Sequence, residues 1–228
     1  MRNIAIIPAR GGSHRLAGKN ILEFHGKPII AWTIAAALES KCFEKIVVST
    51  EDPEIAKVAS KHGADVLVRP AELANDEARV VDVCLHVLEA EKQSGREYDV
   101  LCCLYPTAPL RASSDIKAVL ERIEPGVCEF SLAVTHYYYP PHQALRKEED
   151  NTVTPIWPEW INKREDELGS IVVDNGSTYA VVTSEFKKQK SFYGKNLKSF
   201  TMPHARSVDI NYLEDMEMAR YFYTKINE

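Results

Sequence analysis

The sequence predicts an α/β fold in which a mostly parallel sheet carries helices on both faces. Short runs of β-branched and other apolar residues recur at intervals of 20 to 40 residues, as strands buried on both faces do. The segments between these runs place apolar residues at i, i+3, i+4 and i+7, which is the helical period. Neighbouring parallel strands need a crossover connection, so regular alternation of strand and helix favours a parallel sheet. Ligands then bind at the carboxyl ends of the strands.

The first part of the chain alternates regularly. Strands buried on both faces are expected at residues 4–7, 45–50, 64–68, 100–105 and 130–135. Helical periodicity lies between them, around residues 55–62, 81–88 and 116–123.

The alternation breaks after Thr135. Segment 137–165 is rich in Tyr, Trp and Pro and has no clear helical period, so it is expected to leave the sheet. Because aromatic residues anchor interfaces, this segment is predicted to be a homodimer arm or a lid over the site. The sheet pattern then resumes at 177–182, and a short helix, a strand at 199–202 and a closing helix complete one domain over residues 1–228.

Composition narrows the functional classes. The chain has 228 residues, of which 45% are hydrophobic and 27% charged. A chain of this length and composition can form a globular core without a disulfide or a structural metal. Its net charge of −5 disfavours a nucleic-acid partner. No window approaches the ~20 apolar residues of a membrane span, and the apolar run near Met1 is too short for a signal peptide. We therefore expect a cytoplasmic protein without a membrane partner.

The loop after the first strand is predicted to bind phosphate. Residues 8–20 read PARGGSHRLAGKN, with three fixed positive charges and a histidine in an otherwise acidic protein. Adjacent Gly11 and Gly12 let backbone N–H groups approach an oxyanion, while Arg10 and Lys19 supply charge for a polyphosphate. The spacing is not that of a Walker A loop, and the three-glycine dinucleotide fingerprint is absent. A solvated basic loop is the alternative.

The chain resembles the acylneuraminate cytidylyltransferases, the CMP-sialic acid synthetase family, nearly end to end. The matching stretches follow the family's order and spacing: PARGGSHRLAGKN, GKPIIAWTI, SKCFEKIVVSTED, VLVRPAELANDEA, LYPTAPLR, DNGSTYAV and SVDIN. The resemblance implies a Rossmann-like sheet. It also implies transfer of CMP from CTP to the hydroxyl of a nine-carbon sugar acid, with release of pyrophosphate and with Mg²⁺ as cofactor.

The resemblance also implies roles for individual residues. Those expected at the nucleotide are Arg10, Gly11, Gly12, Ser13, Lys19, Asn20 and Arg69. Those expected at the acceptor sugar are Tyr105, Arg111, Gln143, Arg164, Asn175 and Gly176. A purely structural role is the alternative at two positions: a surface ion pair for Arg69 and a plain turn for Asn175–Gly176. Arg10, Lys19 and Asp209 are the candidate catalytic residues.

Asp209, in SVDIN, is the best metal candidate, because Mg²⁺ on phosphates usually takes one or two carboxylates and keeps water. Residue 211 points the same way on an extended segment. The family generally has Asp-x-Asp, whereas this chain has Asn211, which can coordinate through its carbonyl but cannot act as a base. Glu214 and Asp215 are better explained by a helix start.

The acceptor is expected to be a carboxylated nonulosonic acid. Tyr105 stands where sialate enzymes usually carry Gln and is more like relatives that act on pseudaminic acid. A sugar phosphate would need a second basic cluster, and none is obvious outside Lys163 and Arg164. Two alternatives remain: a cytidylyltransferase for another keto sugar acid, and a nucleotide-binding protein without turnover.

Overall fold

A seven-stranded sheet forms the centre of the computed structural model, which describes residues 1–13 and 15–228. His14, in the predicted phosphate-binding loop, lies outside the described residues. The strands are β1 (Asn3–Pro8), β4 (Lys45–Thr50), β5 (Asp65–Val68), β6 (Val100–Leu104), β7 (Phe130–His136), β10 (Val172–Val182) and β11 (Lys198–Thr201). Their order is β11-β7-β10-β6-β1-β4-β5. Only β10 runs antiparallel to its neighbours, which confirms the mostly parallel sheet for the described part of the chain.

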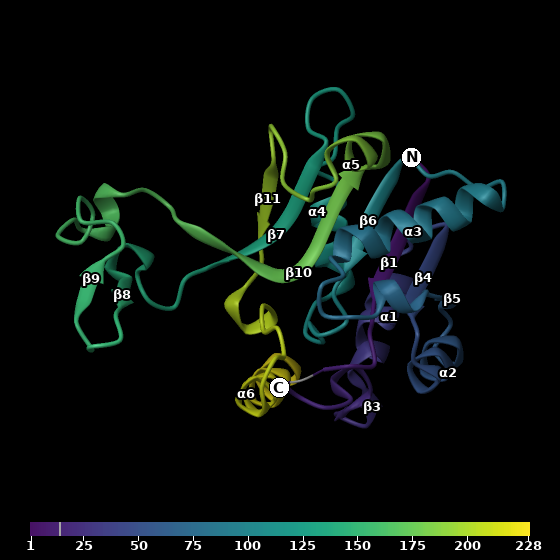
Figure 1. Ribbon diagram of the computed structural model, residues 1–228, viewed down its shortest axis with the longest axis horizontal. Helices are drawn as coiled ribbons and strands as arrows, with labels where there is room; N and C mark the ends of the chain where they lie inside the picture. The colour runs from purple at the N-terminus through teal and green to yellow at the C-terminus, as the bar shows by residue number, and fades with distance from the viewer. Residues whose placement is uncertain (14) are drawn as a thin grey trace.

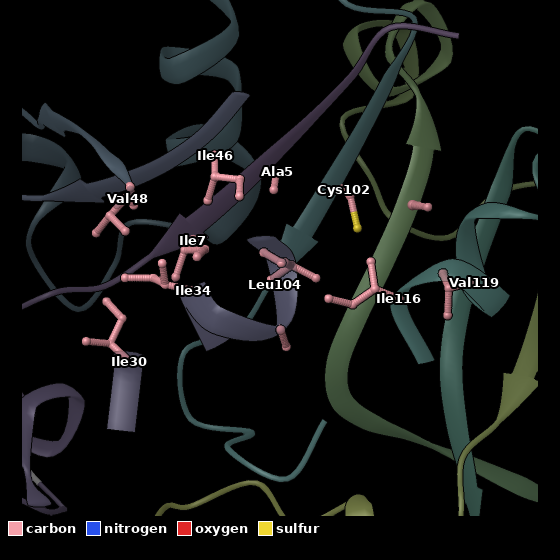
Figure 2. Packing of buried hydrophobic residues seen from close by; sticks show 14 of the residues in the cluster. Ala5, Ile7, Ile30, Ile34, Ile46, Val48, Cys102, Leu104, Ile116 and Val119 are labelled. Carbon is pink, nitrogen blue, oxygen red and sulfur yellow. The ribbon is translucent and has the colours of Figure 1, made fainter. Parts of the chain in front are cut away.

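Helices cover both faces of this sheet, as predicted. Apolar side chains alternate along each buried strand, so that Ile46 and Val48 join one core cluster and Val47 joins the other. The first cluster packs under α1 (Ile29–Ser40), α2 (Pro53–Lys61) and α4 (Ser113–Leu120), and Figure 2 shows part of it. The second packs under α3 (Val80–Gln93) and α5 (Thr183–Gln189).

Two elements differ from the prediction. Helix α1 was not predicted, because its sequence IIAWTIAAALES is apolar around most of its circumference and shows no one-sided period. Strand β5 was expected to be buried on both faces, but it lies at the sheet edge, where Val68 is 69% exposed. An edge strand pairs with a neighbouring strand on one side only, so its other side stays open to solvent.

The segment between β7 and β10 leaves the sheet and projects well away from it, as Figure 1 shows. The chain departs at His136 and returns at Val172, and these two residues are register partners. In between, β8 (Leu145–Lys147) and β9 (Val153–Pro155) form a small hairpin, flanked by the short helices η3 (Pro141–Gln143) and η4 (Glu165–Glu167). We call residues 137–171 the arm.

The closing helix α6 (Leu213–Asn227) packs near the start of the chain. Its Met216 and Ala219 share a third apolar cluster with Phe24 of the two-residue strand β2 (Glu23–Phe24), which pairs with β3 (Lys27–Pro28). The carboxylate of Asp215 accepts the backbone N–H groups of Asn211 and Tyr212 at 2.8 Å, so it caps the helix as predicted. This cap fixes the segment that carries Asp209. No helix in residues 1–13 and 15–228 has the length and apolarity to cross a membrane.

Candidate nucleotide-binding and acceptor site

A cavity of about 450 Å³ opens at the carboxyl ends of β1 and β6, the edge at which a parallel sheet binds ligands. Five parts of the described chain reach it: the loop after β1, the turn after β5, the start of α3, the turn after β6 and the segment before α6. The predicted residues that line it are Arg10, Gly12, Ser13, Lys19, Asn20, Arg69, Tyr105, Asp209 and Asn211.

The loop after β1 presents donors to this cavity. Gly11 passes so close to α2 that a Cβ atom there would lie 2.4 Å from Asp52 Oδ2, which requires glycine. Its N–H donates to Glu51 Oε1 at 2.6 Å, and Arg10 Nη1 donates to Asp76 Oδ1 at 2.6 Å. The chain's own carboxylates therefore accept from donors that suit an oxyanion. Asn20 is buried and donates from Nδ2 to the Arg10 carbonyl at 2.9 Å, which holds the loop in place.

Lys19 lies at the start of the short helix η1 (Lys19–Ile21), preceded by Gly18 in the left-handed region at φ 61°. Its Nζ donates to Asn211 Oδ1 at 3.1 Å. Burial lowers the pKa of Lys19, and the nearby positive charges of Arg15 and Arg10 lower it further, while Asp209 opposes the shift. An anion bound beside Lys19 would favour the ammonium form and oppose this shift.

Arg69 is buried and not part of a surface ion pair. Its Nη1 donates to the Leu73 carbonyl at 3.2 Å, Nη2 donates to the Ser49 carbonyl, and Nε lies 3.6 Å from Glu51 Oε2. Burial lowers the pKa of Arg69, and Glu51 opposes the shift. The arginine braces the turn after β5 against β4 while it also lines the cavity.

Asp209 sits opposite the loop and is held from two sides. The hydroxyl of Thr107 donates to its Oδ1, and Asn211 Nδ2 donates to its Oδ2 at 2.7 Å. Residues 209 and 211 therefore do point the same way. Asn211 forms a bridge, because its amide oxygen accepts from Lys19 and its amide nitrogen donates to Asp209.

The donor set at this point fits Mg²⁺, which prefers carboxylate and amide oxygens and retains water. Asp209 and Asn211 both line the cavity and supply such oxygens. In the described part of the chain, no group of three His, Cys, Asp or Glu side chains could hold a metal by itself. Phosphate oxygens and water would therefore have to complete the coordination shell.

One of the residues predicted to bind the acceptor lines the cavity, and two others contact the segment that carries Asp209. Tyr105 lines it directly, and burial raises the pKa of its phenol. Gly176 is packed against Asp209: a Cβ atom added to this glycine would lie 3.4 Å from Asp209 Oδ2. Its φ of +64° is in the left-handed region. Asn175 is buried and donates from Nδ2 to Ser207 Oγ at 3.1 Å, which ties β10 to the segment before Asp209.

The other three do not reach the cavity in this chain. Arg111 was expected at the acceptor, but it is 3% exposed and its guanidinium donates to the Ser177 carbonyl at 2.6 Å and to Thr33 Oγ1 at 2.8 Å. It is a core brace. Gln143 and Arg164 both lie on the arm and are exposed, and Arg164 pairs with Asp166 at 2.9 Å.

Sequence reasoning did not assign Thr107, Glu51 or Asp76 to the site. Thr107 stands in the LYPTAPLR stretch, but its contact with Asp209 spans 102 residues and has no local signal. Asp76 and Glu51 lie in the stretches LANDEA and STED, where acidic residues are ordinary surface composition. Only the fold brings these carboxylates to the loop after β1.

Comparison with known proteins gives a consistent result. The family model described as cytidylyltransferase matches residues 4–155. A pseudaminic acid cytidylyltransferase of Campylobacter jejuni is 34% identical over 228 residues, covering 100% of this chain and 98% of that protein. A CMP-N,N'-diacetyllegionaminic acid synthase of Legionella pneumophila is 34% identical over 92% of this chain and 91% of that protein. An N-acylneuraminate cytidylyltransferase of Escherichia coli is 32% identical over 98% of this chain and 52% of that protein.

A solved structure shares the fold. The CMP:2-keto-3-deoxy-manno-octonic acid synthetase complexed with CTP superposes with a TM-score of 0.71, covering 99% of this chain and 100% of that chain at 18% identity. This similarity confirms the Rossmann-like α/β arrangement.

Proposed function

Because the chain belongs to the cytidylyltransferase family, we propose that it transfers CMP from CTP to the anomeric hydroxyl of a nonulosonic, sialic-acid-like sugar acid and releases pyrophosphate. The observation that carries this proposal is the cavity itself, in which Arg10, Lys19 and the loop backbone face Asp209 across the carboxyl end of the sheet. The names of the full-length relatives support the class of acceptor.

Different residues of the cavity are proposed to bind different parts of the nucleotide. Arg10, Lys19 and the N–H groups of Gly12 and Ser13 would bind the triphosphate, and Arg69 would line the nucleoside end. The acceptor oxygen forms a bond to the α-phosphorus while the bond from that phosphorus to the pyrophosphate oxygen breaks. Negative charge develops on the departing pyrophosphate, where the Lys19 ammonium would neutralise it. The Asp209 carboxylate accepts a hydrogen bond from Asn211, whose amide oxygen in turn accepts from Lys19.

We further propose Mg²⁺ as the cofactor, held by Asp209 and by the amide oxygen of Asn211. When bound, the ion would neutralise phosphate charge and polarise the reacting phosphoryl group. Asn211 cannot accept a proton, so proton removal from the acceptor hydroxyl falls to Asp209 or to water.

The homodimer and the cytoplasmic location are also proposals. Tyr138 and Tyr139 on the arm are 67% and 82% exposed, and Trp157 stacks on Trp160 at 5.7 Å between ring centroids. A surface of this kind suits burial against a second copy. We propose the cytoplasm because CTP is an intracellular nucleotide.

Pyrophosphate release tests the proposed function. With Mg²⁺, we expect CTP and a panel of nonulosonic acids to yield pyrophosphate, while UTP and ATP give little. Asp209→Ala should abolish both this turnover and any Mg²⁺-dependent rise in Tm with CTP present. No release with any nonulosonic acid, or equal rates with the three nucleotides, would contradict the proposal. Turnover of an eight-carbon keto acid instead would support the alternative acceptor.

A further inference from the structure

The turn after β6 contacts the segment that carries Asp209 through one residue, Thr107. This threonine is 6% exposed, and its hydroxyl donates to Asp209 Oδ1. Its backbone carbonyl accepts the N–H of Ile210 at 2.9 Å. One residue of the turn therefore fixes both the side chain of Asp209 and the backbone that follows it, although Thr107 and Asp209 are 102 positions apart in the sequence.

The two oxygens of the Asp209 carboxylate have different donors. Thr107 donates to Oδ1, and Asn211 Nδ2 donates to Oδ2 at 2.7 Å. Two donors on different oxygens set the rotation of the carboxylate about its bond to Cβ. A carboxylate oxygen has about two lone-pair directions, so each oxygen keeps one for a cation. The carboxylate is thus oriented before any ligand binds.

The turn is itself held in place, as the support of a binding group must be. The buried guanidinium of Arg111 donates to the Tyr105 carbonyl at 3.2 Å and to the Ser177 carbonyl at 2.6 Å. The Tyr105 N–H donates to the same Ser177 carbonyl at 3.0 Å. Thr107 therefore extends from a turn that is fixed to β10, and its β-branched side chain is restricted at χ1.

We propose that Thr107 is a positioning residue that holds the Asp209 carboxylate in the orientation in which it binds a divalent cation. The proposal rests on the proposed function, in which Asp209 is a ligand of Mg²⁺. Loss of the hydroxyl would leave Oδ1 without its donor, so the carboxylate would rotate more freely and the cation would have to order it. Removal of a group that orients a metal ligand typically weakens metal binding about 10- to 100-fold.

Mg²⁺ titrations of two Thr107 variants test this proposal. Thr107→Val replaces the hydroxyl with a methyl group of similar size, whereas Thr107→Ser keeps a hydroxyl. With CTP present and no acceptor, we expect Thr107→Val to need about tenfold more Mg²⁺ for half of the rise in Tm. Thr107→Ser should stay within about twofold of the unaltered protein, because its hydrogen bond remains.

Thr135→Val is the matched control. Thr135 is also 6% exposed, and its hydroxyl donates to the Met202 carbonyl at 3.2 Å. It lies in β7, outside the cavity lining. This variant therefore loses a buried threonine hydroxyl of the same exposure without touching Asp209, and its Mg²⁺ requirement should match that of the unaltered protein.

Turnover separates positioning from a purely structural role. In Thr107→Val, the Mg²⁺ concentration for half-maximal pyrophosphate release should rise about tenfold, while kcat at saturating Mg²⁺ stays close to that of the unaltered enzyme. A threonine with only a structural role would lower kcat or Tm and leave the Mg²⁺ requirement unchanged. That result would overturn the proposal. A loss in Thr107→Ser as large as that in Thr107→Val would also overturn it, because the effect would then belong to the methyl group.

The behaviour of the unaltered enzyme separates this inference from the proposed function. If it releases no pyrophosphate with any nonulosonic acid, the proposed function fails and takes this inference with it. If it releases pyrophosphate without a requirement for Mg²⁺, the transfer stands and the role of Thr107 is overturned. Should Thr107→Val fail to fold, Thr107→Ala against Thr107→Ser makes the same comparison, and equal Mg²⁺ requirements in that pair would contradict the proposal.

Discussion

Lys19 is partly buried between two other cations, and burial is the main reason why its pKa is lowered. In the free protein the lysine therefore loses its proton at a lower pH than an exposed lysine does. Bound triphosphate would favour the ammonium form, so nucleotide binding should be coupled to proton uptake at alkaline pH.

We expect the affinity for CTP to be full below the lowered pKa of free Lys19 and to decline as pH rises through it. The decline should begin below pH 10.5, the ordinary lysine value, and should approach about tenfold per pH unit. Titration calorimetry across this range measures it. Lys19→Arg keeps its charge and should flatten the profile; an unchanged alkaline decline in that variant would assign the titration to another group.

Asn211 occupies a bridging position that an aspartate would alter. Its amide nitrogen donates to Asp209 at 2.7 Å, so Asn211→Asp would replace a hydrogen bond with two neighbouring carboxylates. Without Mg²⁺, we expect a loss of about 1–2 kcal/mol of unfolding free energy. With Mg²⁺ and CTP, the rise in Tm should exceed that of the unaltered protein, and turnover should increase. Thermal melts with and without Mg²⁺ check this, and equal Mg²⁺-induced shifts would contradict it.

Among the elements, the short helix η5 (His204–Arg206) is tied to α4. Arg206 donates to both oxygens of Asp115, at 3.0 and 2.7 Å, and Asp115 is 1% exposed. Asp115 also accepts the Ala112 N–H at 2.9 Å at the start of α4. This pair anchors the chain three residues before Asp209.

Removal of the arginine would leave a buried carboxylate without its cation. Arg206→Ala should therefore cost about 2–3 kcal/mol of unfolding free energy and lower Tm by roughly 4–10 °C. Arg79→Ala, which removes an exposed pair with Asp82 on α3, should leave Tm unchanged. Differential scanning calorimetry compares the two variants, and equal Tm values would show that the buried pair adds nothing.

The elements that sequence could predict are those with a one-sided or continuous apolar pattern. The strands at 45–50 and 100–105 are recovered almost residue for residue, because their β-branched and apolar runs have few other interpretations. Helix α1 was missed because burial on nearly every side removes the helical period. Arg111 was misplaced for a related reason: sequence shows a charge at the end of a strand, but not whether the chain folds over it.

For the molecule as a whole, the arm is the feature that a single chain does not explain. Its aromatic surface projects from the sheet, and Arg164 and Gln143 lie on it, far along the chain from the cavity residues. The prediction of one domain over residues 1–228 stays a prediction.

We expect a homodimer at micromolar concentration, held through segment 137–165, because the exposed tyrosines and the stacked tryptophans would otherwise remain in water. Light scattering gives the mass directly. Trp157→Ala with Trp160→Ala should shift the protein toward monomer, while Tyr221→Ala on α6 should not. A monomeric mass for the unaltered protein would make the lid the better interpretation of the arm.

The arm enters and leaves the sheet through two strands that already pair. His136 and Val172 face one another across β7 and β10, and an antiparallel pair can be closed by a turn of two residues. The arm is therefore an insertion between two paired strands. It can be lengthened, exchanged or deleted without a change in the order of the strands in the sheet. A different module could therefore be grafted at this point while the carboxyl edge of the sheet is left intact.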